Sequence, residues 1–259
     1  MTAMQLKKSR NGLSRLRWAV LEAFAPRRKV VARGLTFTLQ SGNPVTHYRW
    51  RNYNAKEPET LDWIDRWMQE GDLFFDIGAN VGSYSIYAAL RHVQSRVVAF
   101  EPEYANLFLL RQNLLHNGLQ ERVEVYSVAL GNRVGLSRLH IQDWTPGAAL
   151  HTESPSKLTQ TIQKTPVIGR EGIAVTTLDL FCRETGLSPN CLKIDVDGTE
   201  PAILEGAGET LRSSALRSLI LEMSQPEIRS RCVPLLERAG LRRIWADPAG
   251  RKSNEIWSR

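Results

Sequence analysis

The sequence is poor in cysteine and has no long apolar run. Its 259 residues include three cysteines (Cys182, Cys191 and Cys232), and no two of them have CxxC spacing. This argues against a disulfide framework or a zinc site and suits a reducing compartment. No apolar stretch approaches the ~20 residues that span a bilayer. The basic N-terminus lacks the apolar core and the cleavage site of a secretory signal. We therefore expect a cytoplasmic protein.

The positive charge is confined to one end of the chain. The formal net charge is +7, yet residues 1–33 hold nine lysines and arginines and a single acid. The body, residues 34–259, is therefore close to neutral, and a nucleic-acid-binding face across it is not expected. We predict two parts, a basic N-terminal arm over 1–33 and one folded domain over 34–259.

The arm contains one stretch with helical periodicity, residues 12–25. Leu13, Leu16, Val20 and Phe24 fall on one stripe, which predicts an amphipathic helix. This helix could pack on the domain, lie on an anionic membrane surface or bind a partner. The second alternative would place the protein at the inner face of the membrane.

The remainder predicts an α/β fold. Apolar strands separated by helices indicate a mostly parallel sheet that is covered on both faces. The expected strands are 72–76, 96–100, 123–128, 191–196 and 219–223, and the expected helices are 83–92, 104–117, 177–186, 199–212 and 226–239. Upstream, 35–53 is expected to form short strands and turns, and Pro58 opens a helix that Gly71 stops. Segments 241–245 and 254–258 are expected to form a final antiparallel hairpin.

Residues 134–175 interrupt the alternation of strands and helices. The segment is polar and rich in Thr, Ser, Pro and Gly, which predicts an inserted hairpin and loop at the rim of the sheet. Long loops in compact domains are often lids or binding elements, so we expect a role in substrate binding. His140, Trp144 and His151 lie in this insertion, and we expect them to be packing or surface residues.

The sequence DLFFDIGANVG marks the first candidate binding turn. Asp76 ends an apolar strand, and Gly78, Asn80 and Gly82 follow at two-residue spacing. Glycines allow backbone amides to approach a ligand closely. The turn is not GxGxxG, so it fits a dinucleotide poorly, whereas an acid before the first glycine suits a cofactor that bears an ammonium group. A tight turn without a ligand is the alternative.

The next two strand ends supply further candidates. Glu101 follows the second strand, 19 residues beyond Gly82, near the ~20-residue offset at which an acid reaches ribose hydroxyls. A solvated loop acid is the alternative. After the third strand, Ser127 and Ala129 are small enough to lie beside an adenine ring, although core packing would explain them almost as well.

The fourth strand, LKIDVDGTE, has the densest set of charges. Lys193 and Asp195 alternate with Ile194 and Val196, so both charged side chains share one face of the strand. Charges in a buried strand are costly unless they pair or meet a ligand. A structural ion pair is the alternative to a catalytic one. Glu222 ends the fifth strand and is a weaker candidate.

Taken in order, these motifs resemble the FkbM family of methyltransferases. The matching segments are DIGANVG, AFEPE, SVALG, TTLD, LKIDVDGTEPAILEGA, LILEM and SNEIW. The resemblance covers roughly 57–257, including the upstream KEPETLDWI, and leaves the arm outside. One departure is Asp197, where similar sequences often have Glu.

This resemblance implies a Rossmann-like class I methyltransferase fold, a seven-stranded mostly parallel sheet with its last strand antiparallel. It implies S-adenosylmethionine as cofactor, with contacts from Asp76, Gly78, Asn80, Gly82 and Glu101. It also implies O-methylation, commonly of a sugar or another secondary-metabolite hydroxyl, so the expected partner is a small-molecule or glycan acceptor.

The expected mechanism is in-line displacement of the sulfonium methyl by an acceptor oxygen. Asp195 is the candidate base or acceptor-orienting group, with Lys193 positioning it. Glu222 could share the site, and Asp195, Asp197 and Glu200 are the candidate ligands if a divalent ion takes part. An NAD-type oxidoreductase would need the GxGxxG turn that is missing. A catalytically silent adaptor that binds glycan or membrane is the alternative outside enzymes.

Overall fold

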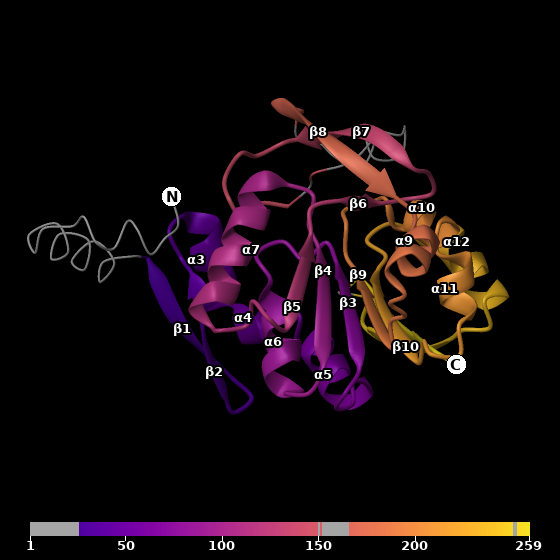
Figure 1. Cartoon of the computed structure of the whole chain (residues 1–259), viewed down its shortest axis with the longest axis horizontal. Helices are drawn as coiled ribbons and strands as arrows, with labels where there is room; N and C mark the ends of the chain where they lie inside the picture. Colours follow the sequence, from indigo (N-terminus) through magenta and orange to yellow (C-terminus); the bar gives the residue numbers. More distant parts are fainter. Residues whose placement is uncertain (1–25, 150, 152–165, 251–252) are drawn as a thin grey trace, which may run out of the picture.

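The computed structural model describes residues 26–149, 151, 166–250 and 253–259. Figure 1 shows a central sheet between two layers of helices, with a separate small sheet above its upper edge. The amphipathic stretch predicted at 12–25 lies outside the described residues. In the part of the chain that is described, no helix is long and apolar enough to cross a membrane.

The described chain begins with a hairpin that precedes the central sheet. Strand β1 (Arg27–Ala32) pairs antiparallel with β2 (Leu35–Gln40), and Val30 and Ala32 are buried in the core. Residues 27–32, the end of the segment that the charge count assigned to the arm, thus belong to the folded body.

Two short helices follow where the sequence predicted only strands and turns. They are α3 (Pro44–Arg51) and α4 (Tyr53–Lys56), and the prediction for 35–53 was wrong in this part. Helix α3 has no apolar stripe that would reveal it. Its start is fixed instead by a capping box, in which the side chains of Asn43 and Thr46 each accept a hydrogen bond from the other residue's backbone N–H.

The central sheet has seven strands in the order β11-β12-β10-β9-β3-β4-β5. Five run parallel, β3 (Leu73–Ile77), β4 (Arg96–Phe100), β5 (Val123–Tyr126), β9 (Cys191–Ile194) and β10 (Ser218–Glu222). The C-terminal hairpin of β11 (Arg242–Ala246) and β12 (Asn254–Ser258) completes the sheet, and β12 is antiparallel to both neighbours. The predicted α/β fold, with its antiparallel last strand, is confirmed.

Alternate residues of each strand enter two separate cores. Phe74 packs with α5 (Pro58–Trp67), α6 (Ser83–Arg91) and α7 (Tyr104–His116) on one face. Phe75 packs with α9 (Leu178–Thr185), α10 (Glu200–Glu205), α11 (Gly208–Arg212) and α12 (Pro226–Arg238) on the other. The single helix predicted over 199–212 is two helices. Gly206 lies at the break, where a Cβ would overlap the carbonyl oxygen of Gly131.

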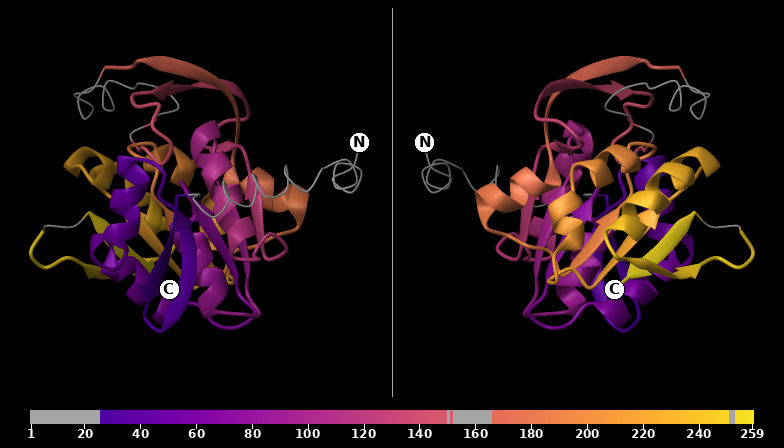
Figure 2. Two further views of the ribbon diagram at one scale, coloured as in Figure 1. Left: turned by 90° about the vertical axis from the view of Figure 1, so that its left-hand side faces the viewer. Right: turned by 90° about the vertical axis from the view of Figure 1, so that its right-hand side faces the viewer.

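The insertion forms a three-stranded sheet of its own. Strands β7 (Gly135–Ile141) and β8 (Gly169–Thr176) pair antiparallel, and β6 (Ala129–Leu130) pairs parallel with β8. Figure 2 shows from two sides that β7 and β8 arch over the body. Strands β7 and β8 lie in the segment predicted to hold a hairpin, and their position above the carboxyl ends of the parallel strands brings them next to the candidate site.

Candidate functional site

The turn after β3 follows the course that its glycines predict. Gly78, Asn80 and Gly82 all have positive φ, the region that glycine, and to a lesser extent asparagine, tolerates. The N–H groups of Gly78 and Ala79 both donate to the Phe100 carbonyl at the end of β4, at 3.0 Å each. A Cβ at Gly78 would overlap the carbonyl oxygen of Asp195. The glycine therefore allows this turn to pack directly on the end of β9.

Gly82 has a packing role within the same turn. It is the N-cap of α6, and a Cβ there would lie 3.2 Å from Leu110 Cγ on α7. It is not among the described residues that line the cavity at the sheet edge.

Glu101 lies beneath this turn and is held by backbone amides. Its Oε2 accepts from the Asn80 N–H at 2.8 Å and its Oε1 from the Glu103 N–H at 2.9 Å. The residue is 5% exposed, and burial raises the pKa of its carboxyl to about 7. The carboxyl is thus fixed in place, and at slightly alkaline pH it is ionised and can accept further hydrogen bonds.

Asp76 is buried behind the turn rather than exposed at its surface. Ser85 Oγ donates to its Oδ2 at 2.6 Å, and Lys193 Nζ lies 3.8 Å from its Oδ1. That Oδ1 atom has no hydrogen-bond partner. Burial raises the pKa of Asp76 despite the nearby lysine. A buried acceptor without a donor is uncommon in folded proteins and fits a site that receives a donor from a ligand.

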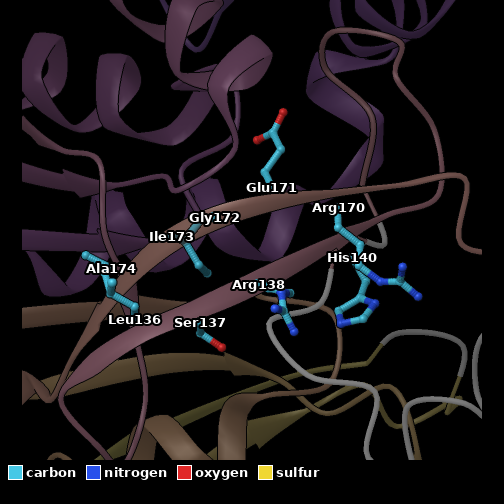
Figure 3. A pocket seen from close by; sticks show the side chains of 9 residues that line it. All are labelled: Leu136, Ser137, Arg138, His140, Arg170, Glu171, Gly172, Ile173 and Ala174. Carbon is cyan, nitrogen blue, oxygen red and sulfur yellow. The ribbon is translucent and has the colours of Figure 1, made fainter.

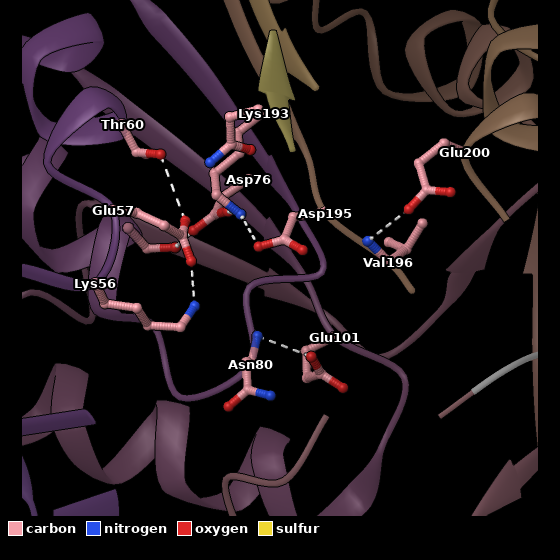
Figure 4. Close-up of polar contacts among 12 residues, drawn as sticks. Lys56, Glu57, Thr60, Asp76, Asn80, Glu101, Lys193, Asp195, Val196 and Glu200 are labelled. Carbon is pink, nitrogen blue, oxygen red and sulfur yellow. Dashed lines mark hydrogen bonds and ion pairs between the residues drawn. The ribbon is translucent and has the colours of Figure 1, made fainter. Parts of the chain in front are cut away.

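Lys193 connects Asp76 to Asp195 at the centre of the sheet (Figure 4). Its Nζ donates to Asp195 Oδ2 at 2.9 Å and lies 5.1 Å from the centre of the Tyr84 ring. Only 3% of the lysine is exposed. Burial opposes its charge, but the carboxylates of Asp195 and Asp76 outweigh burial and raise its pKa. Lys193 therefore stays an ammonium group.

Asp195 and Glu222 form a carboxyl pair. Strand β9 ends at Ile194, two residues earlier than predicted, so Asp195 begins the loop, and 25% of its side chain is accessible. The Lys193 ammonium and a hydrogen bond from Glu222 outweigh burial and lower the pKa of Asp195. Burial and the charge of Asp195 raise the pKa of Glu222 to about 9. Near neutral pH the pair thus shares one proton and one negative charge, with the proton favoured on Glu222 and the charge on Asp195.

Two participants were not predicted from the sequence, Glu57 and Tyr84. Tyr84 lies under the Lys193 ammonium and is hydrogen-bonded to Glu57, which also contacts Lys56 (Figure 4). Glu57 further raises the pKa values of Lys193 and Glu222. The sequence offered one signal for Glu57, the adjacent charged pair Lys56–Glu57, which lies directly before Pro58 at the start of helix α5.

The three metal candidates do not converge. Asp195 is directed at Lys193, whereas Glu200 Oε1 accepts from the Gly198 N–H at 3.1 Å. Burial raises the pKa of Glu200 to about 7. Asp197 has a positive φ of 57° and lines the cavity. Within the described ranges, no three His, Cys, Asp or Glu side chains are grouped to hold a metal ion.

A small cavity joins four of the ten predicted cofactor and catalytic residues, whereas Asp76, Lys193 and Glu222 are not among its described lining residues. Its lining includes Gly78, Asn80, Glu101, Asp195 and Asp197. The two candidates after β5 lie elsewhere, because that strand ends at Tyr126 rather than at residue 128. Ser127 is exposed, and Ala129 packs in the small core of the inserted sheet. Neither belongs to the described lining.

The insertion residues lie in three different places. His151 lines the cavity, Trp144 is 49% exposed, and His140 lies on the open face of the hairpin (Figure 3). There Arg138, His140 and Arg170 point to one side, while Glu171 points to the other. Burial lowers the pKa of His140, and the charges of the two arginines lower it further.

Comparison with known proteins adds independent information. The model of the methyltransferase FkbM domain matches residues 76–238. The 31-O-demethyl-FK506 methyltransferase FkbM of Streptomyces tacrolimicus is 27% identical over 159 residues, covering 54% of this chain and 60% of that protein. Methyltransferase sdnD of Sordaria araneosa is 29% identical over 186 residues, covering 64% and 71%. The chain thus spans less than two thirds of the Streptomyces relative.

One solved structure supports the fold. Aeropyrum pernix fibrillarin, crystallised with natively bound S-adenosyl-L-methionine, has a TM-score of 0.50 at 11% identity. The match covers 90% of this chain and 82% of fibrillarin. At that identity the likeness concerns the arrangement of strands and helices.

Proposed function

The chain belongs to the methyltransferase FkbM domain family, whose model matches residues 76–238, and from this premise we propose that it is an S-adenosylmethionine-dependent O-methyltransferase. The proposed acceptor is a hydroxyl group of a sugar, a glycan or a secondary metabolite. The observation that carries the proposal is a single cavity lined by both Glu101 and Asp195. The Glu101 carboxylate suits ribose hydroxyls, and the Asp195 carboxylate lies beside the buried ammonium of Lys193.

The residues at the sheet edge suit the cofactor's polar groups. Glu101 would accept the ribose hydroxyls, and the turn over Gly78–Gly82 would border the amino-acid portion. Asp76 ends the strand before that turn, and its Oδ1, which has no hydrogen-bond partner, is the carboxylate oxygen that could face an ammonium group. When bound, S-adenosylmethionine supplies an electrophilic methyl group.

Asp195 is the residue that would orient the acceptor. Its carboxylate is ionised, partly accessible and fixed by Lys193 and Glu222. An acceptor hydroxyl that donates to Asp195 presents an oxygen lone pair to the methyl group, and such positioning supplies up to ~7–11 kcal/mol. When the acceptor oxygen takes the methyl group, Asp195 would accept the hydroxyl proton. Asp195 can accept this proton even though its pKa is lowered, because the protonated ether product is a far stronger acid than any carboxylic acid.

The acceptor class is supported by a relative's name. The Streptomyces protein is named for 31-O-demethyl-FK506, a secondary metabolite that would gain a methyl group on oxygen. The polar insertion above the cavity also suits an acceptor rich in hydroxyl groups.

The test is transfer of labelled methyl groups from S-adenosylmethionine to fractionated glycans, lipids, RNA and small metabolites, with the product resolved by mass spectrometry. We expect an O-methyl ether in a glycan or small-molecule fraction. Asp195→Asn keeps the size of the side chain but removes its charge, so it should slow transfer by ~10²–10⁴-fold. Label on nitrogen or carbon, or wild-type turnover by Asp195→Asn, would contradict the proposal.

A further inference from the structure

A short segment after β7 is held over the cavity by side chains from other elements. It consists of Pro146, Gly147 and Ala148 and is called the strap below. Ala148 and its neighbour Ala149 line the cavity together with Glu101. The strap belongs to no strand or helix, so its polar backbone groups depend on partners elsewhere in the molecule.

Asn106 on α7 binds the strap at two points. Its Oδ1 accepts from the Gly147 N–H at 2.7 Å, and its Nδ2 donates to the Ala148 carbonyl at 3.2 Å. The same carbonyl accepts from Asn80 Nδ2 at 2.8 Å. Asn106 is only 2% exposed. Because Asn80 belongs to the turn after β3, the strap is tied directly to the expected cofactor turn.

The other side of the strap rests on α3. Arg49 Nε donates to the Gly147 carbonyl at 2.8 Å, and Asn43 Nδ2 donates to the Pro146 carbonyl at 2.9 Å. Gly147 has a φ of +92°, and a Cβ there would lie 2.9 Å from Thr46 Cγ2. Three successive backbone carbonyls of the strap thus accept hydrogen bonds from side chains distant in sequence.

The closed strap leaves little room beneath it. The cavity measures about 70 Å³, whereas ligand pockets begin at ~300 Å³. A nucleoside-sized ligand exceeds this volume, so part of the cavity wall must shift to admit it, and the strap contributes Ala148 to that wall. The hydrogen bonds of Asn106 favour the position of the strap beside Glu101.

We propose that Asn106 is a positioning residue that holds the strap closed over the bound cofactor and slows release of the demethylated product. This inference rests on the proposed function, because the ligand beneath the strap is the proposed cofactor. The closed strap also keeps water from Glu101, and hydrogen bonds to its carboxylate are stronger in the absence of water.

Helix α7 offers a matched control at its opposite end. Asn117 Oδ1 accepts from the Thr38 N–H at 2.8 Å, and Asn117 Nδ2 donates to the Thr38 carbonyl at 2.8 Å. It thus binds the backbone of β2 as Asn106 binds the strap. Loss of either asparagine removes the same kind of contact, but only Asn106 contacts the cavity wall.

The experiment measures dissociation of S-adenosylhomocysteine by stopped flow, with thermal unfolding recorded for each protein. Asn106→Ala should speed dissociation by ~10-fold or more, while Asn117→Ala should lower the melting temperature similarly and release the ligand at the wild-type rate. If Asn106→Ala does not fold, Arg49→Lys takes its place, since it removes the Nε donor but keeps a positive charge near Glu101. It should speed release by ~3-fold or more.

The outcomes separate the inference from its premise. Suppose that the wild-type chain binds S-adenosylhomocysteine and that Asn106→Ala, or Arg49→Lys where that variant replaces it, releases it at the wild-type rate. This result would leave the proposed function standing but overturn the role of the strap. Equal acceleration in Asn106→Ala and Asn117→Ala would also overturn it, because general loosening of α7 would then be the cause. No binding by the wild-type chain would overturn the proposed function and the inference with it.

Discussion

At the scale of single residues, the central feature is a lysine buried between carboxylates. Lys193 is 3% exposed and contacts Asp195, Asp76 and the Tyr84 ring. Burying an unpaired ammonium would cost several kcal/mol, so Lys193 depends on these neighbours. The stabilisation is mutual, because the Lys193 ammonium in turn keeps Asp195 ionised next to Glu222. The alternation of LKID indicated that Lys193 and Asp195 share a face, and the structure confirms that they pair.

The proton on Glu222 leads to a test by pH. The pKa of Glu222 is raised to about 9, so the folded protein holds a proton there that the unfolded chain loses above its ordinary value near ~4.5. Folding stability from this group is therefore fully present below about pH 4.5 and is lost progressively as pH rises to about 9. Glu222→Gln resembles the protonated acid and cannot titrate. Between pH 7 and 9 its stability should improve by roughly 2 kcal/mol relative to wild type, measured by chemical denaturation at each pH. If the stabilities of wild type and Glu222→Gln changed in parallel with pH, Glu222 would already be ionised at pH 7, and the prediction would be wrong.

Some site residues could be predicted from the sequence and others could not, for a physical reason. Asp76, Gly78, Asn80 and Glu101 follow apolar strands, and parallel strands bring their carboxyl ends to one edge. Glu57 and Tyr84 belong to helices α5 and α6 or the residues before them. Whether a helical side chain meets a strand end depends on how the helix packs, which the spacing of the sequence does not determine.

At the scale of elements, the sheet was predictable and its connections less so. Strands buried on both faces leave apolar runs, and these runs marked all five parallel strands. Helix α3 escaped prediction because a cap rather than an apolar stripe specifies it. The break between α10 and α11 depends on the approach of Gly206 to Gly131 across the fold. The strap could not be predicted for the same reason, because its hydrogen-bonding partners Asn43, Arg49 and Asn106 are 41 to 103 residues away along the chain.

At the scale of the whole molecule, a near-neutral body carries a basic extension. Residues 27–32, which the charge count had assigned to the basic arm, form strand β1 of the β1–β2 hairpin in the folded body. Residues 1–25, which lie outside the described part of the chain and are called the extension below, contain five basic residues and one acid. Removing the extension therefore should not disturb the site, because every described contact of the site lies beyond residue 42.

We expect this extension to bind anionic membrane surfaces. Each basic residue near such a surface contributes ~1 kcal/mol, and the apolar stripe predicted over 12–25 would add to this. The full chain should sediment with phosphatidylserine vesicles at low salt and be released at high salt. A shortened chain that begins at Pro26 should stay in the supernatant yet still bind S-adenosylhomocysteine. If both chains sediment equally, the body and not the extension binds the membrane; if neither does, the expectation is wrong.

The central claim is that the edge of the sheet holds S-adenosylmethionine through Glu101, and titration calorimetry with S-adenosylhomocysteine at pH 8 tests it most directly. At that pH the Glu101 carboxyl, with a pKa of about 7, is ionised. Glu101→Ala should weaken binding by ~1.5–3 kcal/mol, the range for hydrogen bonds to charged groups. Asp72→Ala is the control, since Asp72 is also a buried carboxylate that accepts a backbone amide, from Gln69, but it precedes β3 and is not among the described residues that line the cavity. It should bind within ~3-fold of wild type, and NAD should give no heat with any protein. Unchanged affinity in Glu101→Ala would contradict the account.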